Sequence, residues 1–383
     1  MKKITLLWAI MCMSAMVFAQ TKNLKSADRS LKNGKLDKAV ESIKLAMAEP
    51  ENQAEPNAWF SQAKIYTAVT ATDKPEYKDL EKNSANLAME SFQKAFELDP
   101  SGKIKILGSL EVGKLVNATY DLGATLYAEQ KFLDAATAFK LTVAANTLID
   151  VIDTNAIFNT ALCADAGQDK KTAKEYYTKL VELKANQPNA YISLAGMVRD
   201  EGDKAEAQRL ADMAVEMFPG NYNVAINASG IHLTTENSAR AQQILNHLTE
   251  TQDTNQLVFF ALGVAYDQMK NPVEAEKAYL RAIELKPDYF DAIFNLGAFY
   301  VNQGIEIKKE ADGLPLSETA KYEAMVAQSN EMFKKAIPML EKALNDKPND
   351  IPVMSTLKDL YVHLQMMDKA KEISDQIEEL GTN

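Results

Sequence analysis

The chain has 383 residues, of which 46% are hydrophobic and 25% are charged, a balance typical of a soluble folded protein. Its 15 glycines and 12 prolines are too few for an all-β protein with many tight turns or for a disordered chain. The formal net charge of −11 disfavours nucleic acid and anionic membrane surfaces as partners, because like charges repel. Cys12 and Cys163 are the only cysteines, so no network of disulfides is expected.

The first 19 residues are typical of an export signal. Lys2 and Lys3 precede an apolar run from Ile4 to Phe18, and Val17-Phe18-Ala19 has the small-x-small pattern of a cleavage site. The run is too short for an ordinary membrane span. We therefore predict a signal peptide that is cleaved after Ala19, and a mature chain with no transmembrane segment.

The same segment predicts the location of the protein. A cleaved signal places the mature chain in the periplasm or the outer cell envelope. Anchoring as a lipoprotein through Cys12 is disfavoured, because Met11 stands where a small residue is expected. With Cys12 removed, Cys163 has no partner for an internal disulfide, so stability must come from packing.

An internal repeat follows the leader, and its clearest unit runs from Gln256 to Tyr289. Two amphipathic faces flank a break at Lys270-Asn271-Pro272, where Asn271 is a plausible N-cap. The first face carries Phe259, Leu262, Gly263 and Tyr266, the second carries Ala275, Tyr279 and Ala282, and Pro287 follows. This spacing resembles the tetratricopeptide repeat, with its W-x2-L-G-x2-Y, A-x3-F and P positions.

Related residues recur in a register of 34 residues. Leu296, Gly297 and Tyr300 follow one step later, and Ala241, Leu245 and Leu248 lie one step earlier. The resemblance implies an all-α fold, a TPR α-solenoid in which antiparallel helix pairs form a right-handed superhelix, in an exported bacterial protein. In such a stack, Gly263 and Gly297 let two helices approach closely, opposite Ala275 and Ala336.

The matches divide the chain into successive units. After the signal peptide at 1–19, we predict a degenerate first helix pair at 20–55 and a pair with insertions at 56–113. A regular array covers 114–289, a pair with an insertion at about 305–331 covers 290–349, and a capping pair covers 350–383. The insertion keeps a helical stripe, which predicts that both helices of that unit are extended and joined at Asp312-Gly313-Leu314-Pro315. Pro338 is expected to kink the second of them.

No pattern of residues predicts catalysis. His232, His247 and His363 lack metal-ligand spacing, and His232 occupies a core position that is usually Tyr. The segment Gly108–Leu115 has phosphate-loop spacing, but Leu115 replaces the required Ser or Thr, so we interpret it as a loop into the next helix. Cys163 is expected to be a small buried residue. We predict no enzyme activity, no cofactor and no metal.

The resemblance also implies a binding surface, because the first helix of each TPR pair lines a groove. The groove residues implied here are Tyr120, Phe158, Asn159, Asn227, Phe260, Phe294, Asn295 and Arg199. Asn159, Asn227 and Asn295 recur at intervals of 68 residues, and an amide can both donate to and accept from a peptide backbone. The alternative is that these asparagines and aromatics only join neighbouring helices. The Lys and Arg clamp for acidic peptide ends is missing, which favours a neutral or apolar partner.

Three functions remain open. The first is a non-enzymatic scaffold that binds a protein or peptide in the periplasm or cell envelope. The second is a binding protein for glycans or peptidoglycan fragments, with Phe158, Phe260, Phe294 and Trp59 stacking on sugars. The third is a structural subunit of an envelope assembly that docks through the insertion at 305–331. The sequence does not give the partner or the oligomeric state.

Overall fold

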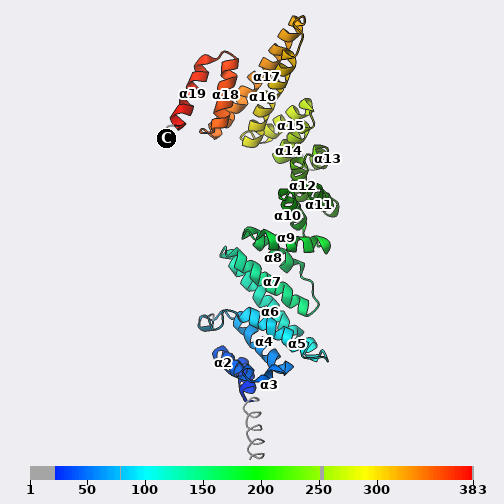
Figure 1. Ribbon diagram of the computed structural model, residues 1–383, viewed down its shortest axis with the longest axis vertical. Coiled ribbons are helices and arrows are strands. Elements are labelled where there is room, and N and C mark those ends of the chain that lie inside the picture. The colour runs from blue at the N-terminus through cyan, green and yellow to red at the C-terminus, as the bar shows by residue number, and fades with distance from the viewer. Residues whose placement is uncertain (1–21, 78, 251–253, 382–383) are drawn as a thin grey trace, which may run out of the picture. The chain divides into compact units, whose positions relative to one another are not determined.

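The computed structural model describes residues 22–77, 79–250 and 254–381, and all regular structure in these ranges is helical. The predicted signal peptide and its cleavage site lie outside the described residues. The chain divides into two compact units, Met1–Leu194 and Ala195–Asn383, and the division falls within α10 (Pro188–Asp200). Each unit is described by itself (Figure 1).

The first unit stacks helix pairs around one apolar core. Described residues 22–32 are helical, and they are followed by α2 (Leu36–Met47), the short α3 (Pro50–Gln53), α4 (Pro56–Thr70), η1 (Pro75–Tyr77), α5 (Ser84–Glu97), α6 (Lys103–Ala128), α7 (Phe132–Leu148), α8 (Thr154–Ala166) and α9 (Lys170–Glu182). The core contains Ile43, Ile65, Tyr66, Phe92 and Leu115. Because these residues come from α2, α4, α5 and α6, consecutive helix pairs share a single core.

The second unit continues the same architecture. Its helices are α11 (Lys204–Met217), α12 (Tyr222–Thr234), α13 (Ser238–Thr249), α14 (Gln256–Gln268), α15 (Pro272–Leu285), α16 (Phe290–Asp312), α17 (Thr319–Asp346), α18 (Ile351–His363) and α19 (Met367–Gly381). Asn271 accepts a hydrogen bond from the backbone N–H of Glu274, which confirms the predicted N-cap of α15. Asp203, Asn221 and Asp350 cap α11, α12 and α18 in the same way.

Glycines at helix crossings set how closely the helices of a pair approach. A Cβ added to Gly263 of α14 would lie 2.5 Å from the ring of Tyr279 on α15. A Cβ on Gly297 of α16 would lie 2.9 Å from Leu340 on α17. The facing Ala275 and Ala336 are fully buried. The predicted role of these small residues is therefore confirmed.

The structure corrects the interpretation of Gly108–Leu115. This segment is not a loop, because α6 runs without a break from Lys103 to Ala128, and the expected unit boundary at residue 113 falls inside it. Gly108, Val112 and Leu115 are buried on one face at helical spacing. Gly108 lies against Phe60 of α4 and Phe96 of α5. The glycine allows the helix to pack closely on two aromatic rings. In the sequence, a glycine required for such packing cannot be distinguished from a glycine of a loop.

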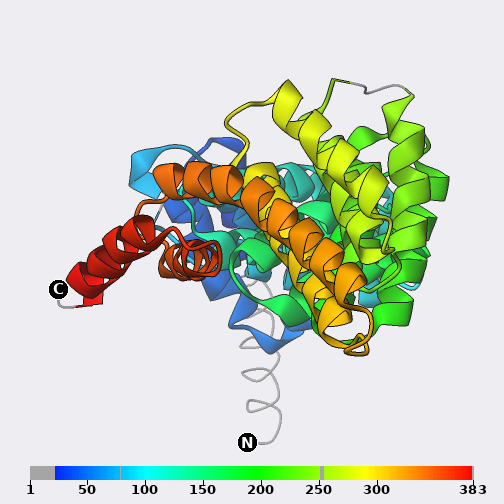
Figure 2. The same ribbon diagram turned by 90° about the horizontal axis from the view of Figure 1, so that it is seen from above.

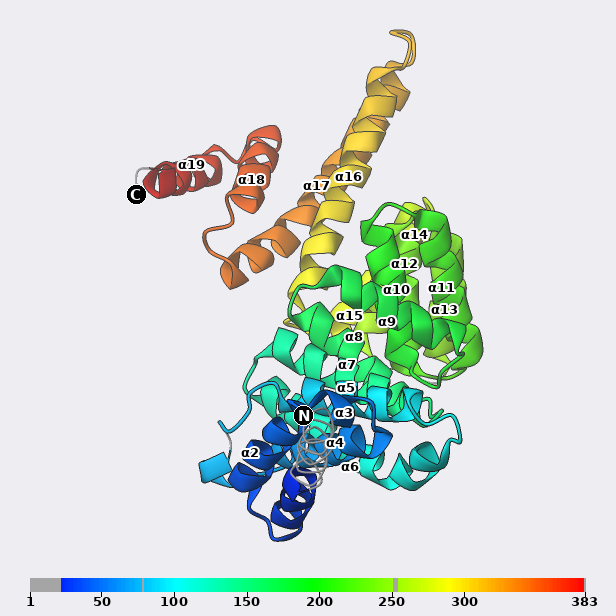
Figure 3. The same ribbon diagram turned by 60° about the horizontal axis from the view of Figure 1, so that its bottom comes forward.

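The extended helix pair is present as predicted. α16 has 23 residues and α17 has 28, and residues 313–318 join them (Figure 2 and Figure 3). Inside the pair, buried Ser329 donates a hydrogen bond of 2.7 Å to the carbonyl of Gly304. Phe333 packs on the same glycine, where a Cβ would lie 2.4 Å from its ring. Pro338 lies within α17, as expected, and a kink there stays a prediction.

A three-residue cluster joins successive helix pairs in the second unit. The hydroxyl of Tyr300 on α16 donates to Glu276 of α15 at 2.7 Å, and Lys335 of α17 donates to the same carboxylate oxygen at 3.0 Å. At the next junction, Tyr361 and Lys369 donate to Glu341 at 2.6 and 2.8 Å. Each carboxylate therefore links its own helix to both helices of the following pair.

The junction of α11, α12 and α13 carries histidine in place of tyrosine. His232 is fully buried, and its Nε2 lies 3.2 Å from Asp212 of α11, which Arg240 of α13 binds at 2.7 Å. Neither ring nitrogen of His232 has an aligned hydrogen-bond partner. Burial lowers the pKa of His232 below its usual value, and the Asp212 carboxylate does not offset this effect.

Gly263→Ala is expected to destabilise the protein by about 1–3 kcal/mol, because the added methyl group would collide with Tyr279. Gly230→Ala is the matched control, since nothing lies within 4 Å of its Cβ position and alanine favours a helix. Chemical denaturation measures both changes. Equal stability of the two variants would contradict the close-approach role of Gly263.

Acid is expected to weaken the His232 junction. The folded-state pKa is lower than the unfolded value, so the unfolded chain binds the proton first and stability falls as the pH drops below about 6.5. The slope should approach, and not exceed, about 1.4 kcal/mol per pH unit. Denaturation of wild type and His232→Tyr between pH 7.5 and 5 measures this difference, with exposed His247→Asn as the control. Parallel profiles for all three proteins would refute the expectation.

Candidate functional site

The structure brings together two of the residues predicted to line a groove. The side chain of Asn159 on α8 donates a hydrogen bond of 3.0 Å to the hydroxyl of Tyr120 on α6. The Tyr120 ring meets Phe139 edge to face, with 5.2 Å between centroids. This amide therefore connects two helices of successive pairs, as the packing alternative for these residues requires.

The other two asparagines are bound within their own helices. Asn227 donates to the carbonyl of Asn223, and Asn295 donates to the carbonyl of Asp291, both at 2.7 Å. Each bond uses one of the two amide N–H groups and leaves the amide oxygen available. Contact of these asparagines with a ligand stays a prediction.

The predicted aromatic residues and Arg199 also have partners within the fold. Phe158 lies 6.3 Å from Tyr177, Phe260 lies 5.4 Å from Tyr289, and Phe294 stacks on Phe290 at 5.9 Å. Arg199 forms an ion pair of 2.8 Å with its neighbour Asp200. These side chains are only partly exposed, and their role in binding stays a prediction.

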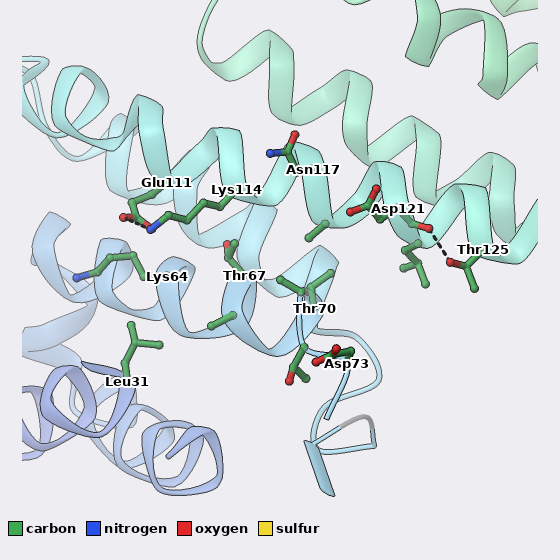
Figure 4. Close-up of a pocket in the computed structure, with 15 residues that line it drawn as sticks. Leu31, Lys64, Thr67, Thr70, Asp73, Glu111, Lys114, Asn117, Asp121 and Thr125 are labelled. Carbon is green, nitrogen blue, oxygen red and sulfur yellow. Dashed lines mark hydrogen bonds and ion pairs between the residues drawn. The ribbon is translucent and has the colours of Figure 1, made fainter. Parts of the chain in front are cut away.

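A groove of the first unit lies between α4 and α6, the helix that carries Tyr120 (Figure 4). Its volume is about 950 Å³, and Leu31 of the first described helix closes one side. The polar and charged side chains of its walls are Lys64, Thr67, Thr70, Thr72, Asp73, Glu111, Lys114, Asn117, Asp121 and Thr125. This size is typical of a ligand site. We call this feature the α4–α6 groove.

Thr67 is the unusual residue of the α4–α6 groove. Its side chain is 2% exposed, and its hydroxyl has no hydrogen-bond partner. Helical threonines elsewhere in the first unit donate to the carbonyl four residues earlier: Thr70, Thr119, Thr125, Thr137, Thr142, Thr147 and Thr160. A buried polar group without a partner costs about 1–3 kcal/mol, so its presence beside a groove indicates a binding role.

The charges of the α4–α6 groove are unevenly compensated. Lys114 pairs with Glu111 at 2.9 Å, and Lys64 pairs with Asp28 at 3.4 Å. Asp73 and Asp121 pair with no cation among the described residues. One end of the groove is therefore acidic, while its two lysines are neutralised within the fold.

The sequence interpretation placed a groove on the first helix of each pair, and α4 and α6 are such helices, but of their residues it named Tyr120 alone as a groove residue. Polar or charged residues recur along α6 at helical spacing, at Glu111, Lys114, Asn117, Asp121 and Thr125. They lie on the face opposite Val112 and Leu115. The prediction of a loop at residues 108–115 excludes Glu111 and Lys114 from the helix, so the polar stripe is incomplete in the sequence interpretation. Only the tertiary structure shows that α4 faces this polar stripe across the groove.

A second cavity, of about 400 Å³, lies in the second unit among α11, α12 and α13. Its walls are mostly apolar, and its cation Arg240 already pairs with Asp212. Cys163 of α8 is buried as predicted, and burial raises the pKa of its thiol to about 11, so it is a poor nucleophile. The described residues include no group of three His, Cys, Asp or Glu side chains placed to hold a metal ion.

Asn159→Ala is expected to lower stability by about 1 kcal/mol, because it removes the hydrogen bond to Tyr120. Tyr120→Phe should cost a similar amount. The double variant should cost less than the sum, since both changes remove the same bond. Asn227→Ala is the control, as its bond lies within one exposed helix face. Additive losses in denaturation experiments would show that the two side chains act independently.

Comparison with known proteins identifies the repeat. The tetratricopeptide repeat model matches residues 257–289, the segment of α14 and α15. The human protein O-mannosyl-transferase TMTC3 is 29% identical over 125 residues, which are 32% of this chain and 14% of that protein. The chain therefore spans about one seventh of this relative's length.

Solved structures of similar fold include several tetratricopeptide repeat proteins. YrrB, described as a TPR protein with an unusual peptide-binding site, is 16% identical, with a TM-score of 0.40 over 54% of this chain and 97% of its own. A tetratricopeptide repeat protein from Parabacteroides merdae is 13% identical, with a TM-score of 0.40 over 74% and 95%. One from Bacteroides fragilis is 20% identical, with a TM-score of 0.30 over 65% and 98%.

None of the described helices is both long enough and apolar enough to cross a membrane. The described elements are helix pairs, and one of them matches the repeat model directly. Residues 257–289 of this chain are therefore identified as a tetratricopeptide repeat.

Proposed function

We propose that this protein is an exported, non-enzymatic scaffold that binds a segment of another protein, and that the α4–α6 groove is its principal binding site. The observation that carries the proposal is the unpartnered hydroxyl of Thr67 in a groove of about 950 Å³. Arrays of tetratricopeptide repeats are interaction surfaces, which gives the coarser assignment.

Protein is favoured over glycan as the ligand by the positions of the aromatic side chains. Phe158, Phe260 and Phe294 each pack on another ring, and the indole N–H of Trp59 donates to the carbonyl of Gln53 at 2.9 Å. The α4–α6 groove offers hydroxyl, amide and charged groups instead. Such groups suit a peptide, whose backbone donates and accepts along its whole length.

Export is the part of the proposal that rests on the sequence alone. Lys2, Lys3, the apolar run to Phe18 and the pattern ending at Ala19 support a cleaved signal. The mature protein would then begin at Gln20 and meet its partner in the periplasm or outer envelope.

A photo-crosslinking amino acid at Asn117 tests the proposal in the cells that produce the chain. Asn117 is exposed at the groove, so irradiation should join the protein to one or a few defined partners. The same group at exposed Asp288, in the second unit, is the control. Mass spectrometry should identify different products for the two positions and find Gln20 at the N-terminus of the purified protein.

Two results would refute the proposal. If Asn117 yields no product, or only those obtained from Asp288, the groove does not bind a partner. If the purified protein still carries Met1, export with cleavage is wrong, whatever the crosslinks show.

A further inference from the structure

We infer that the α4–α6 groove holds an extended segment of its partner, with apolar side chains at one end and lysine or arginine at the other. This inference rests on the proposed function and specifies the chemistry of the partner. Three features of the first unit support it: an exposed apolar surface on α6, the acidic end of the groove, and Thr67 between them.

The apolar surface lies on the first turns of α6. Ile106, Leu107 and Leu110 are 74, 76 and 73% exposed, although the helix buries Gly108 and Val112 on its opposite side. Three large apolar side chains at this exposure on a single helix face indicate an interaction site. We call these residues the α6 ledge.

The α6 ledge is continuous with the groove. Leu107 precedes Glu111 by one helical turn, and Leu110 precedes Lys114 by one turn, so the ledge extends the groove wall along the same helix. A chain lying in the groove would therefore reach the ledge without changing direction.

The opposite end of the groove is acidic. Figure 4 shows Asp73 and Asp121 on opposite sides of the groove, both toward the end away from Lys64 and Glu111. The two lysines of the groove are compensated by Asp28 and Glu111, whereas Asp73 and Asp121 have no cation among the described residues. Charge complementarity therefore selects a lysine or arginine on the partner at this end.

Thr67 lies between the two ends and lacks an acceptor for its hydroxyl. Figure 4 shows its side chain between α4 and α6, on the side of Lys114 and Asn117. The hydroxyl oxygen is buried, so the side chain must first rotate about χ1 to turn it toward the groove, where a backbone carbonyl would supply that acceptor. The Asn117 amide lies on the facing wall. The hydroxyl thus indicates a ligand that offers a peptide backbone between its apolar and its basic side chains.

Length sets the spacing of the partner's residues. Leu107 and Asp121 are separated by about 21 Å along α6, at 1.5 Å per residue. An extended chain covers this distance with about six residues. An extended partner segment therefore carries its apolar and basic residues about six positions apart.

Fluorescence anisotropy with labelled synthetic peptides tests the inference on the mature chain. The probe is Leu-Leu-Gly-Ser-Gly-Ser-Arg-Lys, in this order and reversed, because the structure does not fix the direction of the ligand. The comparison peptides replace Arg-Lys by Glu-Asp or Leu-Leu by Ser-Ser. We expect one orientation of the probe to bind at least about tenfold more tightly than either comparison peptide.

Variants locate the binding. The double variant Asp73→Asn with Asp121→Asn should bind the probe about tenfold more weakly, and the salt dependence of binding should be smaller. The double variant Leu107→Ser with Leu110→Ser should lose a similar amount of affinity. The matched controls are Asp288→Asn with Asp346→Asn, and Leu316→Ser, because these side chains are exposed in the second unit. Both controls should retain the affinity of wild type.

Thr67→Val separates a binding role from a structural one. Because the hydroxyl has no partner in the fold, its removal should leave the Tm unchanged or higher, while the probe binds more weakly. A fall in Tm with unchanged affinity would make Thr67 a structural residue and remove it from the inference.

Other outcomes bear on the two proposals separately. If acidic and basic peptides bind equally, or the ledge and acidic-end variants bind like wild type, the inferred chemistry is wrong. If no peptide binds while Asn117 still crosslinks to a defined partner, the inference fails and the scaffold function stands. If neither peptides nor crosslinks are found, both fail.

Discussion

Close packing between successive helices is the constraint on which the structure depends, because no helix pair can bury its apolar face alone. Gly263 against Tyr279, Gly297 against Leu340 and Gly304 against Phe333 place a helix backbone directly on a neighbouring side chain. Fully buried alanines such as Ala275 and Ala336 serve the same end from the partner helix. The 34-residue register follows from this requirement, since a small residue must recur wherever two helices cross.

Polar contacts join successive helix pairs where this packing places tyrosine hydroxyl groups at the junctions between the pairs. The carboxylates of Glu276 and Glu341 each receive a tyrosine hydroxyl and a lysine, so every donor meets an acceptor. His232 occupies the same kind of junction, but burial lowers the pKa of its imidazole below the usual value, whereas burial raises the pKa of Tyr300 and Tyr361. The second unit therefore contains one junction where acid acts on a buried imidazole, whereas at the junctions of Glu276 and Glu341 acid acts on carboxylates whose pKa is lowered.

The proposed binding site lies where the repeat departs from its regular form. α6 has 26 residues against 13 in α8, and the additional turns carry both the α6 ledge and the start of the polar stripe along the groove. Here the packing rules are satisfied on one face only, which leaves Ile106, Leu107 and Leu110 exposed and Thr67 without a partner. Of the residues first expected to bind a ligand, Tyr120 also lies on α6, and Phe294 and Asn295 lie on the extended α16. Many of the expected residues contact neighbouring side chains.

The sequence by itself determined the all-helical repeat, the cap at Asn271, the close approach at Gly263 and Gly297, and the extension of α16 and α17. These features are encoded by neighbours within about 40 residues, so spacing reveals them. Only the tertiary structure decided that Gly108 lies inside a helix, because its reason is contact with the rings of Phe60 on α4 and Phe96 on α5, which spacing along the chain does not reveal. Only the tertiary structure placed Thr67 and Asp73 opposite Asn117 and Asp121, since a groove is formed by side chains from separate helices, and their spacing along the chain carries no record of which helices meet.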